Sequence, residues 1–356
     1  GAQAGPQLAQ TLQLVTQTAT GLGVAVGAGA QALLDAHSVS IGDGAIALHN
    51  EAGIPLRSLG TGSARLLVAG LQRAAAAAAT VALVDEVEYG LEPHRLMRLL
   101  DSLGAKDATQ PLQAFMTTHS PVTLRELAGS QLFVVRQRSG IHTATCAGTD
   151  DGIQGTLRKS AEAFLSKAVI VCEGASEVGF ARGMDQWWSQ CGATSFLAHG
   201  GSYVDAGGGS PDQCFARGEA FLQLGYRVLV FIDADRPVST LGLVERFVAA
   251  GGQYITWRPG FALEDELFRH SSNDAVYALL NKADEMVGRA LMADHIRSKS
   301  NGQVTLDAIE AERLNGYTPA SRALLGLAAR NSKNGWFKSV SCFQEVAKDI
   351  VGPHLP

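Results

Sequence analysis

The sequence lacks closely spaced cysteine pairs and long apolar runs, and each absence excludes a class of protein. Its 356 residues contain five cysteines, and no two of them form a CxxC pair. This spacing argues against a zinc ribbon and a disulfide-stabilised scaffold, and it favours a reducing cytoplasm. No apolar stretch reaches the roughly 18 residues that cross a bilayer, and no signal-peptide pattern opens the chain. We therefore expect a cytoplasmic protein with no membrane partner.

The chain also lacks a strong charge of either sign. Its formal net charge is −5, from 29 Lys and Arg residues against 34 Asp and Glu residues. This balance weakens the expectation of a nucleic-acid partner, but a local basic face is compatible with an acidic total. Acids that bind divalent cations would also move the balance toward neutral. At 46% hydrophobic residues, the composition is that of a globular chain with room for two domains.

Three short apolar runs stand out, and an acid follows each of them. The runs, with their acids, are 81–84 before Asp85 and Glu86, 168–172 before Glu173, and 228–232 before Asp233. Continuous apolar runs of this length suit strands that are buried on both faces of a parallel sheet. Because ligands bind at the carboxyl ends of such strands, the acids lie where chemistry is expected.

The remaining pattern predicts an α/β protein with two domains, 1–150 and 160–356, separated near a polar, glycine-bearing segment at 149–155. In the first domain the expected elements are a strand-like stretch over 39–56, helices over 63–79 and 93–103, and strands over 113–117 and 131–137. In the second they are strands over 168–172, 195–198, 228–232 and 253–257, helices over 176–190, 212–224 and 241–250, and a mainly helical segment around 264–330.

Two adjacent carboxylates follow the first apolar run. In nucleotide hydrolysis Asp85 would hold Mg²⁺, and Glu86 would orient or deprotonate the attacking water. Upstream, Gly60 and Gly62 belong to the sequence LGTGS at a predicted helix start, where backbone N–H groups face a phosphate. His119, after the next predicted strand, would lie near a γ-phosphate. These residues form a candidate nucleotide site.

In this order and spacing, the segments resemble the ABC ATPases of the SMC, RecF and OLD type. Residues 59–63 resemble the signature motif, the acid pair resembles Walker B, 89–93 resembles the D-loop, and His119 resembles the switch histidine. Gly60 stands where the signature usually carries serine, and no GxxxxGK[ST] loop is present. The resemblance implies the C-terminal half of an ABC ATPase domain, either as part of a longer protein, which we favour, or as a degenerate half. ATP would bind only in the full-length protein.

Four acids accompany the later apolar runs. Glu173 ends a predicted strand, and Glu177 begins the following helix, whose N-terminus partly neutralises it. Asp233 and Asp235, at spacing i, i+2 on an extended chain, point the same way. Clustered carboxylates repel one another unless they are protonated or bound to cations. Hard oxygen ligands suit Mg²⁺ or Mn²⁺ rather than zinc.

This arrangement is similar to the Toprim fold of topoisomerases, bacterial primases and OLD-family nucleases, and the likeness covers roughly 167–257. Its marks are a strand-terminal glutamate followed by glycine and a DxD motif that closes a later strand. The resemblance implies that Glu173, Asp233 and Asp235 bind metal. In the nuclease branch, Glu177 is a further ligand.

Two later segments favour the OLD nucleases among these relatives. Glu264 resembles their ligand for a second metal. Asp265 and Glu266, which follow it, are as consistent with a solvated helix start as with metal binding. The sequence NSKNGWFK near the end resembles their terminal motif, in which a lysine reaches the active site. Lys338 is our choice for this lysine and Lys333 is the rival. Alternatively, Trp336 and Phe337 pack a terminal helix beneath surface lysines.

Together these features resemble a class 2 OLD-family endonuclease, a type of protein associated with phage defence. The resemblance implies two-metal hydrolysis of DNA with two Mg²⁺ or Mn²⁺ ions, Glu173 as the central acid, and Lys338 offsetting charge. In the full protein it implies an ATP-dependent homodimer, and some OLD systems have a companion helicase. The alternative is a non-catalytic DNA-binding or partner-docking module with a regulatory metal site. A Rossmann oxidoreductase is disfavoured because no GxGxxG follows an early strand.

Overall fold

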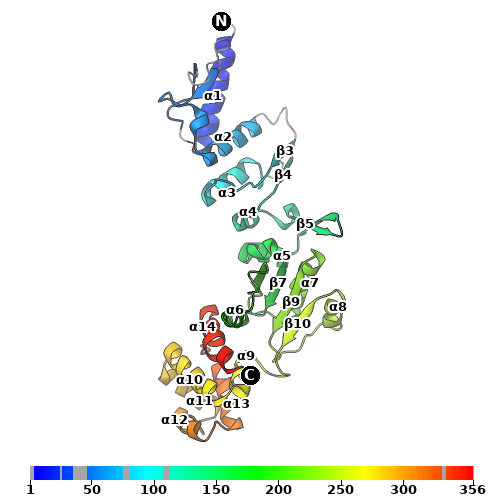
Figure 1. Ribbon diagram of the computed structural model, residues 1–356, viewed down its shortest axis with the longest axis vertical. Coiled ribbons are helices and arrows are strands. Elements are labelled where there is room, and N and C mark those ends of the chain that lie inside the picture. Colours follow the sequence, from blue (N-terminus) through cyan, green and yellow to red (C-terminus); the bar gives the residue numbers. More distant parts are fainter. Residues whose placement is uncertain are drawn as a thin grey trace. The chain divides into compact units, whose positions relative to one another are not determined.

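A computed structural model of the chain shows two compact units, Gly1–Leu132 and Phe133–Pro356 (Figure 1). It describes residues 4–24, 26–34, 46–74, 81–106, 113–330 and 334–355. The division falls after Leu132 rather than at 149–155, because an antiparallel hairpin and a short helix that precede the second parallel sheet are compact with the second unit. Among the described residues, no helix is both long and apolar enough to cross a membrane.

The first unit is a small α/β assembly. Its elements are α1 (Ala4–Leu22), β1 (Gln31–Leu34), β2 (Ile46–His49), η1 (Leu56–Ser58), α2 (Thr61–Ala74), β3 (Val81–Val84), α3 (Pro93–Ser102), β4 (Gln113–Met116), α4 (Pro121–Glu126) and η2 (Gly129–Gln131). β1 and β2 pair antiparallel, and β3 and β4 pair parallel. The core forms where α1, α2 and α3 bury residues such as Val15, Leu66 and Leu96.

The strand at 81–84 is present, but the expectation that it is buried on both faces is wrong. Leu83 of β3 is 80% exposed, and Phe115 of β4 is 56% exposed. The physical reason is that the described residues place only β4 beside β3. Residues 35–45 and 75–80, which include parts of the predicted strand-like stretch and of the predicted helix over 63–79, lie outside the described residues.

The second unit begins with the hairpin of β5 (Phe133–Arg138) and β6 (Ile141–Cys146), followed by α5 (Asp151–Lys159). The next elements alternate: η3 (Ala161–Leu165), β7 (Ala168–Cys172), α6 (Ala175–Gln190), β8 (Gly201–Asp205), α7 (Pro211–Gln223), β9 (Arg227–Ile232), α8 (Leu243–Ala249) and β10 (Gln253–Thr256). The rest is helical: α9 (Leu263–His270), α10 (Asn273–Val287), α11 (Arg289–Lys299), α12 (Leu306–Ala311), η4 (Glu312–Leu314), α13 (Pro319–Ala329), α14 (Val340–Glu345), the π-helix η5 (Val346–Val351) and η6 (Gly352–His354).

β7 to β10 form one parallel sheet in the order β10-β9-β7-β8. The apolar runs of β7 and β9 are largely buried, as their composition predicts. These two strands are neighbours, and Cys172 is in register with Phe231. The residues that follow them, Glu173 and Asp233, therefore leave the sheet at the same edge.

The predicted strand at 195–198 is wrong, because these residues form a turn and β8 begins at Gly201. The backbone N–H of Phe196 donates to the Asp185 carboxylate at 2.7 Å, which draws this segment toward α6. A Cβ on Gly201 would lie 2.4 Å from the Phe196 ring, so the strand starts where glycine permits this close contact. The paired strand ends at Asp205, beside the end of β7.

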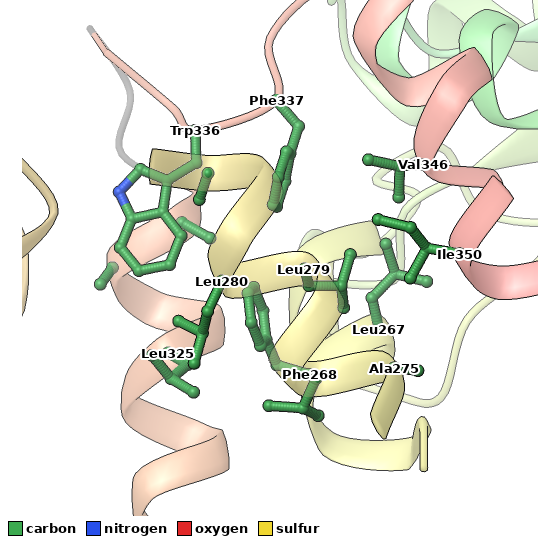
Figure 2. Close-up of a cluster of buried hydrophobic side chains, with 14 of the residues drawn as sticks. Leu267, Phe268, Ala275, Leu279, Leu280, Leu325, Trp336, Phe337, Val346 and Ile350 are labelled. Atoms are coloured by element: carbon green, nitrogen blue, oxygen red, sulfur yellow. The ribbon is translucent and has the colours of Figure 1, made fainter. Parts of the chain in front are cut away.

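The helices after β10 enclose an apolar core (Figure 2). Trp336 and Phe337 are 1% and 0% exposed and pack against Phe268 of α9. The Trp336 indole N–H donates to Nδ1 of His295 at 3.1 Å, so its polar atom has a partner inside the core. The chain on either side of these two residues is thereby anchored.

Candidate functional site

The acids proposed as metal ligands line one pocket of about 500 Å³ at the carboxyl edge of the parallel sheet in the second unit. The charged residues that line it are Glu173, Glu177, Asp205, Asp233, Asp235, Glu264, Arg330 and Lys338. The sequence reasoning missed Asp205 and Arg330. The position of Asp205 at the end of β8 was hidden by the misplaced strand, and nothing in the sequence around Arg330 marked it. Lys333 lies outside the described residues.

Glu173 and Asp233 are joined by a direct hydrogen bond. The Asp233 N–H donates to Oε2 of Glu173 at 3.1 Å, and Arg236 donates to Oε1 at 2.5 Å. The Glu173 side chain is 8% exposed, whereas that of Arg236 is 53% exposed. The acid is therefore held inside the pocket by the neighbouring strand and by an arginine that remains open to solvent.

Glu177 lies in the first turn of α6, as predicted, and is buried. Its Oε2 accepts a hydrogen bond from the Gly174 N–H at 2.8 Å. This contact closes the turn between β7 and α6, since the third residue of the helix reaches back to the residue before it. The turn places the carboxyl groups of Glu173 and Glu177 in the same pocket.

Backbone hydrogen bonds attach the DxD loop to the start of α9. Ala234 donates to the Phe261 carbonyl oxygen and accepts from the Gly260 N–H, each at 2.9 Å. The Leu263 N–H donates to Oδ1 of Asp233 at 3.0 Å. This pairing of segments brings Glu264 to the pocket from the first turn of α9, although it lies far from the DxD motif in the sequence.

The carboxyl groups in the pocket perturb one another. Burial, followed by the charges of Glu177 and Glu264, raises the pKa of Asp233 to about 9. Burial and the charges of Glu264 and Glu173 raise the pKa of Glu177 to about 7. Burial also raises the pKa of Glu173 and of Glu264. The pocket therefore disfavours full ionisation of its acids unless cations enter it.

The chemistry of these ligands suits a hard divalent cation, because every candidate ligand atom is a carboxylate oxygen. Among the residues that the structure describes, however, no group of three acids, histidines or cysteines has the arrangement of a metal site. Oxygens of Glu173, Glu177 and Asp233 instead accept hydrogen bonds from backbone N–H groups.

Lys338 lines the acidic pocket, and the residues before it determine its position. Trp336 and Phe337, which precede it, are buried in the core, as the packing interpretation of the terminal motif expects, while Lys338 itself reaches the pocket. A Cβ on Gly335 would lie 2.8 Å from Cγ and Cε of Lys338, which shows that the lysine stem lies over the glycine. The Lys338 charge counteracts the rise in the Glu264 pKa that burial causes.

In the first unit, the acid pair after β3 is bound to the segment after β4. Oδ1 of Asp85 accepts a hydrogen bond from the Thr117 hydroxyl at 2.5 Å, and that hydroxyl accepts one from the Glu86 N–H at 2.8 Å. Glu86 has a φ of 45°, which is uncommon for a residue other than glycine. The His119 N–H donates to Glu88 at 2.5 Å. Thr117 and Glu88 were not anticipated from the sequence.

The segment with Gly60 and Gly62 also reaches this region. A Cβ on Gly62 would lie 2.2 Å from the Gly90 carbonyl oxygen, so only glycine fits there, whereas Gly60 has open space around its Cα. Arg65, one turn into α2, donates to the Asp85 carbonyl oxygen at 2.7 Å and to that of Tyr89 at 3.2 Å. The helix start, the acid pair and the following loop therefore come together.

In a comparison with protein families, residues 25–125 match the family described as "AAA domain, putative AbiEii toxin, Type IV TA system". The match includes the glycine segment, the acid pair and His119, and it ends before the second unit. No curated protein matches the chain. The first unit therefore contains an ATPase-type domain.

Proposed function

We propose that the second unit is a metal-dependent DNA endonuclease of the Toprim type, related to the class 2 OLD enzymes. The observation that carries this proposal is the convergence of five separate acids and Lys338 on one pocket at the carboxyl edge of a parallel sheet. Acids from the ends of β7 and β9 meet an acid from α9 and a lysine from the terminal segment there. Glu173, Glu177 and Glu264 are buried, whereas Asp235 is exposed. A solvated surface would not bury three acids in this way.

Two Mg²⁺ or Mn²⁺ ions suit the charge of the pocket. Six carboxyl groups and two cationic side chains line it. When all of them are ionised, four negative charges remain, which is the charge that two divalent ions balance. The proposed ligands are Glu173, Glu177, Asp233, Asp235 and Glu264. When bound, the ions would supply an activated water and stabilise the leaving 3′ oxygen of a phosphodiester.

The protein side chains have their own tasks in this proposal. Glu173, fixed by the Asp233 N–H, would be the central acid of the site. Lys338 would stabilise negative charge that develops on the phosphate oxygens in the transition state. Arg236, which is half exposed at the pocket, would attract the DNA backbone. In the full-length protein, ATP-driven dimerisation of the ATPase-type domain would control access of DNA.

The test is incubation of the purified chain with supercoiled plasmid DNA and Mg²⁺ or Mn²⁺, beside the Glu173→Gln and Lys338→Ala variants. We expect nicking by the parent, its loss in Glu173→Gln, and binding of Mn²⁺ in calorimetry that weakens in the same variant. Nicking that survives Glu173→Gln contradicts the assignment. Mn²⁺ binding and DNA binding without any cleavage would instead support the non-catalytic module with a regulatory metal site.

A further inference from the structure

We propose that Arg330 is a second cationic catalytic residue that contacts the phosphate at the cleavage site beside Lys338; the inference rests on the proposed nuclease function. Arg330 follows the last residue of α13 and lines the acidic pocket. Arg330 and Lys338 are the cationic side chains that the described part of the chain contributes to its lining. A polyanionic substrate that enters this pocket would meet these two residues.

Two carboxylates hold the Arg330 guanidinium group. Its Nη1 lies 3.0 Å from Oδ2 of Asp265 and 3.7 Å from Oδ2 of Asp235. The Asp265 side chain is 3% exposed, and its Oδ2 also accepts a hydrogen bond from the Ala262 N–H at 3.2 Å. A solvated helix start, one of the two alternatives that the sequence left open for Asp265, is therefore wrong. Asp265 fixes the guanidinium from inside, next to Glu264 in the same helical turn.

A glycine makes this geometry possible. A Cβ on Gly326, one turn before Arg330, would lie 2.8 Å from Oδ1 and 2.9 Å from Cα of Asp265. The Arg330 N–H donates to the Gly326 carbonyl oxygen at 3.2 Å, so the two residues belong to one helical turn. The close approach of α13 to α9 thus places the guanidinium against the acid that orients it.

The chemistry of the group fits a phosphate. A guanidinium carries five N–H donors in a rigid plane and stays charged at all working pH values. Both ion pairs in the structure use the same nitrogen, Nη1. The planar fork suits bidentate contact with phosphate oxygens, whereas Lys338 supplies a point charge. The two cations would therefore have different tasks, with Arg330 orienting the phosphate and Lys338 stabilising charge.

A purely structural role would be the neutralisation of buried Asp265, and the experiment separates the two roles. Arg330→Ala, Arg330→Lys and the double variant Arg330→Ala with Asp265→Asn are compared with the parent, and Arg297→Ala serves as the control for loss of an exposed arginine. Nicking rates in Mn²⁺ and thermal unfolding are measured. Binding of a fluorescent DNA duplex is followed by anisotropy in Ca²⁺ at several salt concentrations.

We expect Arg330→Ala to lower the nicking rate about 10²–10³-fold. We also expect the slope of log K for DNA binding against log salt concentration to decrease by about one, which corresponds to the loss of one phosphate contact. Arg330→Lys is expected to restore binding but not the rate, and the double variant to stay inactive. Full activity in the double variant would overturn the inference, because Arg330 would then only neutralise Asp265. Nicking by Arg330→Ala at the parental rate would overturn it too. If the parent itself does not cleave DNA, the proposed nuclease function is contradicted. The phosphate contact of Arg330 is tested separately, and it is contradicted if the salt dependence of DNA binding is the same in Arg330→Ala as in the parent.

Discussion

Gly179, two residues after Glu177, lies against the backbone of Val340, two residues after Lys338. A Cβ on Gly179 would lie 2.4 Å from the Val340 carbonyl oxygen. α6 and α14 therefore pack at backbone distance at this point. Since Glu177 lies in the first turn of α6 and Lys338 lies two residues before α14, this contact fixes an acidic and a basic residue of the pocket relative to each other.

Replacement of Gly179 by alanine is expected to separate the two helices. The added methyl group meets backbone that has no alternative rotamer, so we expect a loss of about 1–3 kcal/mol in the free energy of unfolding. The nicking rate is expected to fall more than tenfold. Urea unfolding and plasmid nicking measure the two effects. The matched control is Gly155→Ala in α5, where a Cβ has open space. Parental stability and activity in Gly179→Ala would contradict the role assigned to this contact.

The strands that carry the acids are predictable because their apolar runs are long, continuous and bounded by acids. β7 and β9 begin and end within one residue of the predicted bounds, and Glu173 and Asp233 follow them. Such a pattern has one stable solution, a buried parallel strand with polar residues at its carboxyl end. The same reasoning misjudged β3, since burial depends on which other elements cover a strand and not on its composition alone.

The other parts of the site depend on contacts that leave little mark in the sequence. Asp205 is the last residue of a strand whose position is decided by the fit of Phe196 against Gly201, and local propensity favoured the wrong segment. Arg330 looks like any surface arginine until α13 is placed against Asp265. Tertiary packing determines both positions. The hydrophobic periodicity of strands and helices, two and 3.6 residues, carries no information about this packing.

The stability of the metal-free protein is expected to fall as pH rises from about 5 to 9. The folded-state pKa values of Glu177 and Asp233, about 7 and about 9, lie above the unfolded values of roughly 4. The folded state therefore binds more protons across this range, and alkaline pH removes stability. Urea unfolding in EDTA at pH 5 and pH 9 measures the difference, which should reach at least about 1.4 kcal/mol, the equivalent of one pKa unit.

Asp233→Asn provides the control for this titration. An amide at residue 233 carries no charge at any pH, so the variant should lose less stability between pH 5 and pH 9 than the parent does. Saturating Mn²⁺ should stabilise the parent more at pH 9 than at pH 5, because protons compete with the ion for the carboxylates. A parent whose stability stays level or increases over this range would show that the pocket does not raise the pKa values of Glu177 and Asp233.

The purified chain is expected to show no ATP turnover. The first unit contains an ATPase-type domain in which Thr117 bonds to both Asp85 and Glu86, but the sequence has no GxxxxGK[ST] loop to hold the β- and γ-phosphates. Phosphate release in Mg²⁺ and ATP is the measurement, with Glu86→Gln as the comparison. Turnover by the parent that disappears in Glu86→Gln would show that the chain binds ATP productively without this loop.

Lys338→Ala is expected to lower the nicking rate about 10²–10³-fold, because it removes a charge that would stabilise the transition state. Lys333→Ala is expected to change the rate less than tenfold, so that the pair decides between the two lysines of the terminal motif. Lys348→Ala is the control, since that partly buried lysine pairs with Asp349 at 3.3 Å and lies outside the pocket lining. Rates are compared at saturating Mn²⁺ with thermal unfolding alongside. A larger loss in Lys333→Ala would transfer the catalytic charge to that residue. Equal, small losses in both variants would show that neither lysine is catalytic. The terminal motif would then serve to pack Trp336 and Phe337 in the core.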